Sequence, residues 1–368
     1  MKLIAKGIKT QVVFIISMLA ALITCIFVPV DKEYLTYFDM RTLACLYGTL
    51  AVIGALKNVN FFKILAKQIV LRLDNTRNAI LGVVLLTLVA SMFFTNDMAL
   101  LSFLPLGFFI LDSTGNNKHL AFTFIMQNMA ANLGGMITPF GNPQNLYLYS
   151  YFQIPTSEFF GIMFLPFAVS TIMIILCCLF IKPEKLSLKD NHEYIIDTKR
   201  ILIYCFLFLC SILIVFRIIP YIVGALFITI VLLFMDKKAI REVNYPLLLT
   251  FCAFFVFSGN MARISFMQTF FEALMPKNPL LFGVLCSQVI SNVPAAVLLS
   301  KFTMDYRSLL VAVNIGGCGT LVASLASLIT FSEYRKCGKG EAKHFIKLFT
   351  ILNIVFLAIL YLVQTMFS

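Results

Sequence analysis

The sequence predicts an all-α polytopic membrane protein, with about nine transmembrane helices plus two re-entrant hairpins in two inverted-topology repeats with broken helices. The first observation is composition: of 368 residues, 60% are hydrophobic and only 12% are charged, whereas soluble domains carry about 25% charged residues. The second is that apolar runs long enough to span a bilayer recur along the chain. The third is that one pair of polar motifs occurs in each half.

Nine runs have the length and composition of spanning helices. The first contains no charged residue, and at about 1.5 Å per residue it covers a hydrocarbon core of about 30 Å. The predicted spans are residues 10–30, 37–56, 119–150, 158–181, 200–216, 219–235, 244–259, 307–331 and 346–367. With the N-terminus in the cytoplasm, the cytoplasmic loops hold 22 of the 29 lysines and arginines. The positive-inside rule therefore favours that orientation.

Two further apolar segments are predicted to be hairpins. Segment 279–304 has limbs of about 12 residues, or roughly 18 Å, which is too short to cross, so we expect it to be re-entrant. Segment 79–111 has limbs of about 14–16 residues, and length alone leaves open whether it is re-entrant or fully spanning. Residues 120–157 carry no charge and are too many for one straight span. We expect a break at "GGMITPFGNPQN", where glycine and proline weaken the helix.

The same two motifs appear in the same order in both halves of the chain. "FFTNDMA" (93–99) aligns with "VISNVPA" (289–295), and "NLGGMITPFGNPQN" (132–145) aligns with "NIGGCGTLVASLAS" (314–327). Because five crossings separate the two starts, the halves are predicted to be inverted, with a binding site near the midplane where they meet. The predicted division is an N-terminal transmembrane helix, 1–36; a first repeat, 37–181, with hairpin 79–111 and broken helix 119–150; a cytoplasmic linker, 182–200; and a second repeat, 201–368, with hairpin 279–304 and broken helix 307–331.

The polar residues of these motifs favour ion and anion binding over catalysis. Helix N-termini suit anionic oxygens, and unwound carbonyls with Ser, Thr and Asn oxygens suit sodium. Asn96 and Asn292 can donate and accept hydrogen bonds, so they can serve either ligand. Asp97 is predicted to bind a coupling cation or carry a proton, with a purely structural carboxylate as the alternative. Its aligned neighbourhood holds Val293 and Pro294, so the second tip has no matching acid.

Several function classes lack support in the sequence. No P-loop, GxSxG, HExxH or carboxylate pair outside the linker loops is present, which disfavours an enzyme. The net charge of +12 resides in short loops, where it sets topology, so no nucleic-acid partner is expected. The three histidines do not cluster, so we expect no metal site apart from sodium at the hairpin tips. No cofactor is expected, and sodium or a proton would be the coupling ion.

The stretches "FFTNDMALLSFLPL", "NLGGMITPFGNPQNLYL" and "SNVPAAVLLS…NIGGCGTLVAS" resemble the ion transporter superfamily of arsenite permeases, NhaD-type sodium/proton antiporters, citrate permeases and divalent anion:sodium symporters. The resemblance implies two half-sites in which the tips and the following broken helices bind carboxylate and sodium. It also implies a homodimer with an elevator-like movement of its transport domain. The implied site residues are Thr95, Asn96, Thr138, Gly141 and Asn142 in one half, and Ser291, Asn292, Thr320, Ala323 and Ser324 in the other.

The sequence therefore predicts a secondary active transporter in a prokaryotic cytoplasmic membrane. It would move a small anion, either a carboxylate or an inorganic oxyanion, coupled to sodium or protons. The alternative is a sodium/proton antiporter in which Asp97 exchanges the two cations. A membrane-embedded enzyme or a non-transporting scaffold is the remote interpretation from other classes. The expected partners are the anion, the lipid bilayer and a second copy of the chain.

Overall fold

The computed structural model describes residues 2–61, 75–185 and 197–367. Within these ranges the regular structure is helical, with one isolated bridge between Asn75 and Lys185. Most of the predicted linker, 182–200, coincides with residues 186–196 and so lies outside the described residues. The described part of the chain is all-α, as the sequence predicts.

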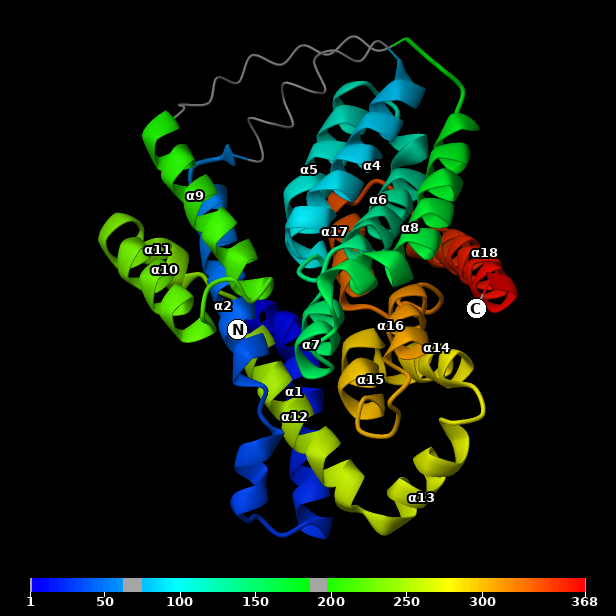
Figure 1. The fold of residues 1–368 in the computed structure, drawn as a ribbon. Coiled ribbons are helices and arrows are strands. Elements are labelled where there is room, and N and C mark those ends of the chain that lie inside the picture. The colour runs from blue at the N-terminus through cyan, green and yellow to red at the C-terminus, as the bar shows by residue number, and fades with distance from the viewer. Residues whose placement is uncertain (1, 62–74, 186–196, 368) are drawn as a thin grey trace.

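One group of helices lies on the left of Figure 1. It comprises α1 (Lys2–Phe27), η1 (Lys32–Tyr37), α2 (Met40–Asn58), α9 (Thr198–Val215), α10 (Tyr221–Met235), α11 (Lys237–Arg241) and α12 (Tyr245–Arg263). Side chains fix where these helices begin: Asp39 accepts a hydrogen bond from the Thr42 amide (3.1 Å) at the start of α2. The Asn260 amide donates to Thr24 Oγ1 (3.1 Å), which ties α12 to α1.

The remaining helices form a second group on the right of Figure 1, which we call the core body. It comprises α4 (Thr76–Phe93), α5 (Asn96–Ser113), η2 (Asn117–His119), α6 (Leu120–Gly134), η3 (Gly135–Ile137), α7 (Pro143–Tyr151), α8 (Thr156–Leu179), α14 (Pro279–Ile290), α15 (Asn292–Leu299), α16 (Tyr306–Ile315), α17 (Leu325–Cys337) and α18 (Ala342–Phe367). The amphipathic helix α13 (Ser265–Leu274) leads from α12 to α14. Helix α17 continues beyond residue 331, where the sequence pattern loses its apolar character, and ends at Gly338 with φ +64°.

The described residues contain six helices that are long and apolar enough to cross a membrane: α2, α4, α8, α9, α12 and α18. Nine such spans are predicted from the sequence. The number differs because the runs 119–150 and 307–331 are each divided into shorter helices, and because α10 has only 15 residues. The part of α1 that was compared, Phe14–Phe27, is shorter than the predicted span 10–30, while α4 is long enough although its segment is predicted to be a hairpin. The chain is a polytopic membrane protein.

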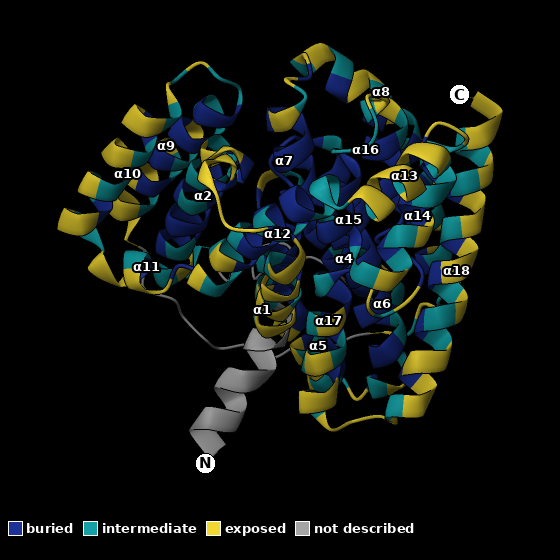
Figure 2. Ribbon diagram, turned by 90° about the horizontal axis from the view of Figure 1, so that it is seen from below, coloured by how far each residue is buried: buried dark blue, intermediate teal, exposed yellow. Residues whose placement is uncertain are grey.

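Burial follows the pattern expected for a protein surrounded by lipid. In Figure 2 the helices at the centre of the core body, α6, α7, α15 and α16, are mostly buried, whereas α10 and α18 expose one side. The exposed sides are apolar: Phe234 of α10 is 88% exposed, and Met366 of α18 is 78% exposed. Buried side chains, in contrast, include many amides and hydroxyls. Polar groups inside and apolar groups outside are what a bilayer solvent selects.

The two groups of helices meet through α7 and α15 of the core body. Ser258 Oγ of α12 donates a hydrogen bond to the Val297 carbonyl of α15 (2.6 Å). Arg217, between α9 and α10, donates to the Tyr149 carbonyl of α7 (2.6 Å) and lies 4.5 Å above the Tyr149 ring. These contacts hold the outer ends of α7 and α15 against the first group. The opposite ends of both helices begin at the polar motifs.

Candidate functional site

Four polar segments converge in the core body. Two are the hairpin tips, where α4 turns into α5 at Thr95 and α14 turns into α15 at Ser291. Ser291 turns with φ +76°, a conformation that side chains rarely adopt. The other two are the breaks: residues 135–142 separate α6 from α7, and residues 316–324 separate α16 from α17.

Each tip is attached to the break of its own half by a backbone hydrogen bond. The Asn96 amide N–H donates to the Gly141 carbonyl (3.2 Å), and the Asn292 N–H donates to the Ala323 carbonyl (2.9 Å). These two bonds connect residues that are aligned with one another in the repeated motifs. The first N–H groups of α5 and α15 would otherwise be unpaired, as at any helix start.

Two threonines make a second matched pair of contacts. Thr138 Oγ1 donates to the Met92 carbonyl (2.6 Å), and Thr320 Oγ1 donates to the Gln288 carbonyl (3.1 Å). Both hydroxyls therefore anchor a break to the first arm of its hairpin. Close packing accompanies them: a Cβ on Gly134 would lie 2.5 Å from Ser91 Oγ, and one on Gly316 would lie 2.9 Å from Ser287 Oγ. Glycine at these positions lets the break and the hairpin arm approach.

Asparagines connect the two halves to each other. Asn132 Oδ1 accepts from Asn96 Nδ2 (3.0 Å) and from Ser324 Oγ (2.9 Å), so it joins the first tip to the second break. Asn142 Nδ2 donates to Asn314 Oδ1 (3.2 Å), which joins the first break to α16. In the alignment of the motifs, Asn132 matches Asn314 and Asn142 matches Ser324. The two cross-connections are therefore related by exchange of the halves.

Several polar atoms of this cluster are buried without a hydrogen-bond partner in the described structure. They are Thr95 Oγ1, Asn132 Nδ2, Asn142 Oδ1 and Gln144 Oε1. Asn142 and Gln144 both donate to Asn314 Oδ1, and Asn142 also donates to the Asn132 carbonyl, so these residues are neighbours. A buried polar atom without a partner costs about 1–3 kcal/mol. The cluster thus holds the Asn132 amide donor, the Thr95 hydroxyl that can donate or accept, and two amide acceptors that a bound ligand would satisfy.

Asp97 lies beside the first tip and is only 8% exposed. Its backbone N–H donates to Asn96 Oδ1 (2.9 Å). Its carboxylate makes no hydrogen bond or ion pair with any described residue, and it is the acidic residue in the first turn of α5. The N-terminal end of a helix stabilises a negative charge.

The structure places the remaining predicted site residues unevenly. Gly141 and Ala323 present only backbone carbonyls, and these are already used by the tips. Thr320 is exposed, whereas its counterpart Thr138 is buried. Asn292 lies against Gly317, where a Cβ would be 2.9 Å from its Nδ2. No side-chain hydrogen bond of Asn292 to the first half is found among the described residues.

Sequence reasoning did not select five amides that organise the site: Asn132, Gln144, Asn145, Gln288 and Asn314. Asn145 Nδ2 donates to the carbonyls of residues 135, 136 and 138, and so holds the first break together. Asn314 Nδ2 donates to Asn145 Oδ1 (2.6 Å). The available signal was an uncharged amide inside an apolar run, because a buried amide needs partners.

The second break is held by a different device, the side chain of Gln288. Its Nε2 donates to the carbonyls of Gly316 (2.8 Å) and Cys318 (2.9 Å), and its Oε1 accepts from the Thr320 N–H (2.9 Å). The aligned residue in the first half is Met92, which has no such groups. The first break is therefore held by a residue of the helix that follows it, Asn145 of α7, and the second by a residue of the hairpin arm, Gln288 of α14.

We expect Gln288→Met to lower the thermal unfolding temperature of the purified protein, because three backbone groups of the second break lose their partner. The expected loss is about 1–3 kcal/mol. The matched control is Cys286→Met, two residues earlier in the same helix, whose side chain makes no hydrogen bond with any described residue. Equal unfolding temperatures for the two variants would show that Gln288 does not hold the break.

The sequence was also compared with known families and proteins. The profile of the citrate transporter family matches residues 2–306. The chain belongs to the citrate transporter family. Among its relatives, an uncharacterized transporter of Methanocaldococcus jannaschii is 32% identical over 293 residues, covering 79% of this chain and 80% of the relative. The inner membrane protein YbiR of Escherichia coli is 28% identical over 312 residues, covering 82% of each chain.

A more distant relative is a silicon efflux transporter of Oryza sativa, 32% identical over 133 residues, or 35% of this chain and 27% of the relative. Membership in the citrate transporter family makes the chain a multi-pass membrane transporter rather than an enzyme. The family match ends at residue 306, so the second break, 316–324, lies beyond it.

Proposed function

We propose that this protein is a secondary active transporter of a small anion, a carboxylate or an inorganic oxyanion, coupled to sodium or protons. The observation that carries the proposal is the buried cluster joining the halves, with Asn132 Nδ2 as an unbonded donor and Asn142 Oδ1 and Gln144 Oε1 as unbonded acceptors. An amide donor suits an anionic oxygen, and amide oxygens suit a desolvated cation. Residues 79–117 and 119–181 contain no lysine or arginine. Amide and backbone dipoles would therefore hold the anion.

We also propose that the two halves are inverted repeats and that both hairpins are re-entrant, with about nine crossings and a cytoplasmic N-terminus. The matched hydrogen bonds at Asn96 and Asn292, and at Thr138 and Thr320, support equivalent halves. The distribution of loop charges supports the orientation. Alternating access would then place the site at the interface of the repeats. The division into two groups of helices, joined through α7 and α15, is compatible with an elevator-like movement in a homodimer.

Asp97 supports a second candidate, a sodium/proton antiporter. A buried carboxylate with no partner in the described structure can hold either cation and release it when the other binds. In that mechanism the amide cluster would complete the sodium site and no organic anion would be carried. The two candidates differ in whether cation exchange requires an anion.

The deciding measurement uses liposomes that contain the purified protein and a pH-sensitive dye. We expect added sodium to cause no proton movement when no anion is present. Citrate, succinate and sulfate are then tested as substrates under sodium and proton gradients. For the anion that is taken up, Asp97→Asn should reduce gradient-driven uptake about ten-fold or more, which corresponds to about 1.4 kcal/mol or more. The matched control is Asp112→Asn in the same helix, because the Asp112 carboxylate bonds to Asn117 and Lys339 instead.

One result would overturn the proposed function, and another would overturn only the role given to Asp97. Sodium-dependent proton movement without any anion, lost in Asp97→Asn but kept in Asp112→Asn, would establish the antiporter. Full gradient-driven uptake by Asp97→Asn would assign the Asp97 carboxylate a structural role and leave coupling to the amide cluster.

A further inference from the structure

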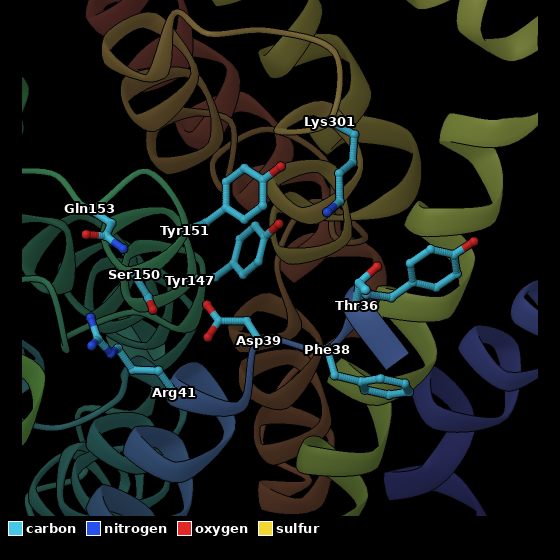
Figure 3. A pocket seen from close by; sticks show the side chains of 10 residues that line it. Thr36, Phe38, Asp39, Arg41, Tyr147, Ser150, Tyr151, Gln153 and Lys301 are labelled. Carbon is cyan, nitrogen blue, oxygen red and sulfur yellow. The ribbon is translucent and has the colours of Figure 1, made fainter. Parts of the chain in front are cut away.

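A cavity of about 270 Å³ lies away from the hairpin tips, between the two groups of helices. Its walls are residues 36–41 at the end of η1 and the start of α2, the end of α7 from Tyr147 to Gln153, and Lys301 just after α15. Figure 3 shows the Lys301 ammonium and the Asp39 carboxylate both directed into the space, with the Tyr147 and Tyr151 rings beside them. The cavity is polar and lies where loops predicted to face outward meet.

The basic side chains of this cavity have no ion-pair partner in the described structure. The Lys301 ammonium lies 4.7 Å from the centre of the Tyr151 ring, and the Arg41 guanidinium lies 5.9 Å from that of Tyr221. Both side chains are partly buried. The single acid, Asp39, uses both carboxylate oxygens to bind Thr42, through its N–H (3.1 Å) and its hydroxyl (2.8 Å). The lining therefore carries two bases and one acid that already caps a helix.

Two other bases at the same end of the molecule, Arg307 and Arg263, are paired with acids. Arg307 donates to Glu158 Oε1 through Nη2 (2.7 Å) and Nε (3.0 Å). Arg263 pairs with Asp31 (2.6 Å), and its hydrogen bond holds the pKa of the Asp31 carboxyl below its usual range. Lys301 and Arg41 thus differ from these neighbours: each lines the cavity without a direct ion-pair partner among the described residues, and together with Asp39 they leave the lining with a net charge of +1.

Two helices connect this cavity to the amide cluster. Helix α7 starts next to Asn142 and ends at Tyr151, and α15 starts at Asn292 and is followed by Ser300 and Lys301. Tyr147 and Ser300 share a hydrogen bond of 2.8 Å, which joins the two helices at the cavity. At about 1.5 Å per residue, the nine residues of α7 span about 13 Å.

We propose that this cavity is an entrance site that binds a small anion, a carboxylate or an oxyanion, before it reaches the hairpin tips. Lys301 and Arg41 supply the charge, and Ser150 and Gln153 supply neutral hydrogen-bonding groups. Bases in a partly enclosed pocket raise the local concentration of an anion. The destination of the anion rests on the proposed function, but its binding in the cavity does not, so the two can be tested separately.

The test measures anions in the cavity without requiring transport. The chain has no tryptophan, so Tyr151→Trp provides a single fluorophore in the cavity wall when excited at a wavelength that tyrosine does not absorb. The protein is placed in nanodiscs of neutral phosphatidylcholine. Quenching is measured with iodide, with caesium and with uncharged acrylamide. In this background we compare Lys301→Gln, Lys301→Arg and the control Lys277→Gln, which removes an exposed base from a neighbouring loop.

We expect Lys301→Gln to reduce the iodide quenching constant about two-fold or more, since one of two nearby positive charges is lost. Acrylamide quenching should not change, and Lys301→Arg and Lys277→Gln should keep iodide quenching. Citrate or sulfate should displace iodide from the unsubstituted cavity. Equal iodide quenching in Lys301→Gln and Lys277→Gln, or stronger quenching by caesium than by iodide, would overturn the proposal. Either result is independent of whether the protein transports an anion.

Discussion

Asn132→Ala is expected to abolish most transport and to destabilise the protein. Asn132 Oδ1 accepts hydrogen bonds from the Asn96 amide and the Ser324 hydroxyl, both of which are buried. Removing this acceptor leaves two buried donors unpaired, at about 1–3 kcal/mol each. It also releases the first tip from the second break. We expect affinity for the transported ion or anion to fall about ten-fold or more, since 1.4 kcal/mol is ten-fold in binding.

The matched control is Asn353→Ala. Asn353 of α18 is also fully buried, but its amide donates only to the Phe349 carbonyl of its own helix. Both variants are measured by uptake in proteoliposomes and by thermal unfolding. If Asn132→Ala lowers the unfolding temperature but transports as well as Asn353→Ala does, the link between the halves is not used in transport.

A double-mutant cycle isolates the bond between the halves. Ser324→Ala removes the other partner of the Asn132 contact, and the two side chains lie 2.9 Å apart. Residues in direct contact show coupling energies of about 0.5–3 kcal/mol. A coupling within this range, absent between Asn353→Ala and Ser324→Ala, is the expected result.

The polar motifs could be found from the sequence because polar residues are costly within a bilayer, and those inside an apolar run are therefore rare and easily noticed. Asn96, Asn292 and the two glycine pairs stand out for this reason, and the structure ends α6 and α16 at those glycines. The family resemblance stated from the same residues is confirmed by the match over residues 2–306. Hydropathy alone overcounts the simple spans, because it treats 119–150 and 307–331 as continuous. Their division was instead predicted from glycine and proline in the first run and from the repeated motif in the second, and the structure divides both runs there.

The partners of the amides were also beyond sequence reasoning. Asn132 and Asn314 occur in aligned motifs, yet Asn132 accepts from the first tip while Asn314 accepts from Asn142 and Gln144. Likewise Gln288 holds the second break, whereas Asn145 holds the first. Each choice depends on side-chain reach and on which carbonyls are unpaired. Aligned positions therefore do not imply equal roles.

Gly141→Ala tests this difference between the halves most directly. The aligned residue in the second half is Ala323, so the repeat alone predicts that alanine is tolerated at residue 141. The structure predicts the opposite. A Cβ at residue 141 would lie under 3.0 Å from the carbonyl oxygens of Gly135 and Ser91, which are backbone atoms that cannot turn away.

The break would have to shift, and the shift would pull on the first tip, because the Gly141 carbonyl accepts from the Asn96 N–H (3.2 Å) and its N–H donates to Thr138 Oγ1 (3.0 Å). Overpacking of this kind costs about 1–3 kcal/mol or more. We expect a lower unfolding temperature and loss of transport. The control is Gly161→Ala in α8, where nothing lies within 4 Å and alanine should be neutral or stabilising by up to about 1 kcal/mol. If Gly141→Ala and Gly161→Ala behave alike in both measurements, the first break is as adaptable as the second, and the asymmetry argued from Asn145 and Gln288 has no functional consequence.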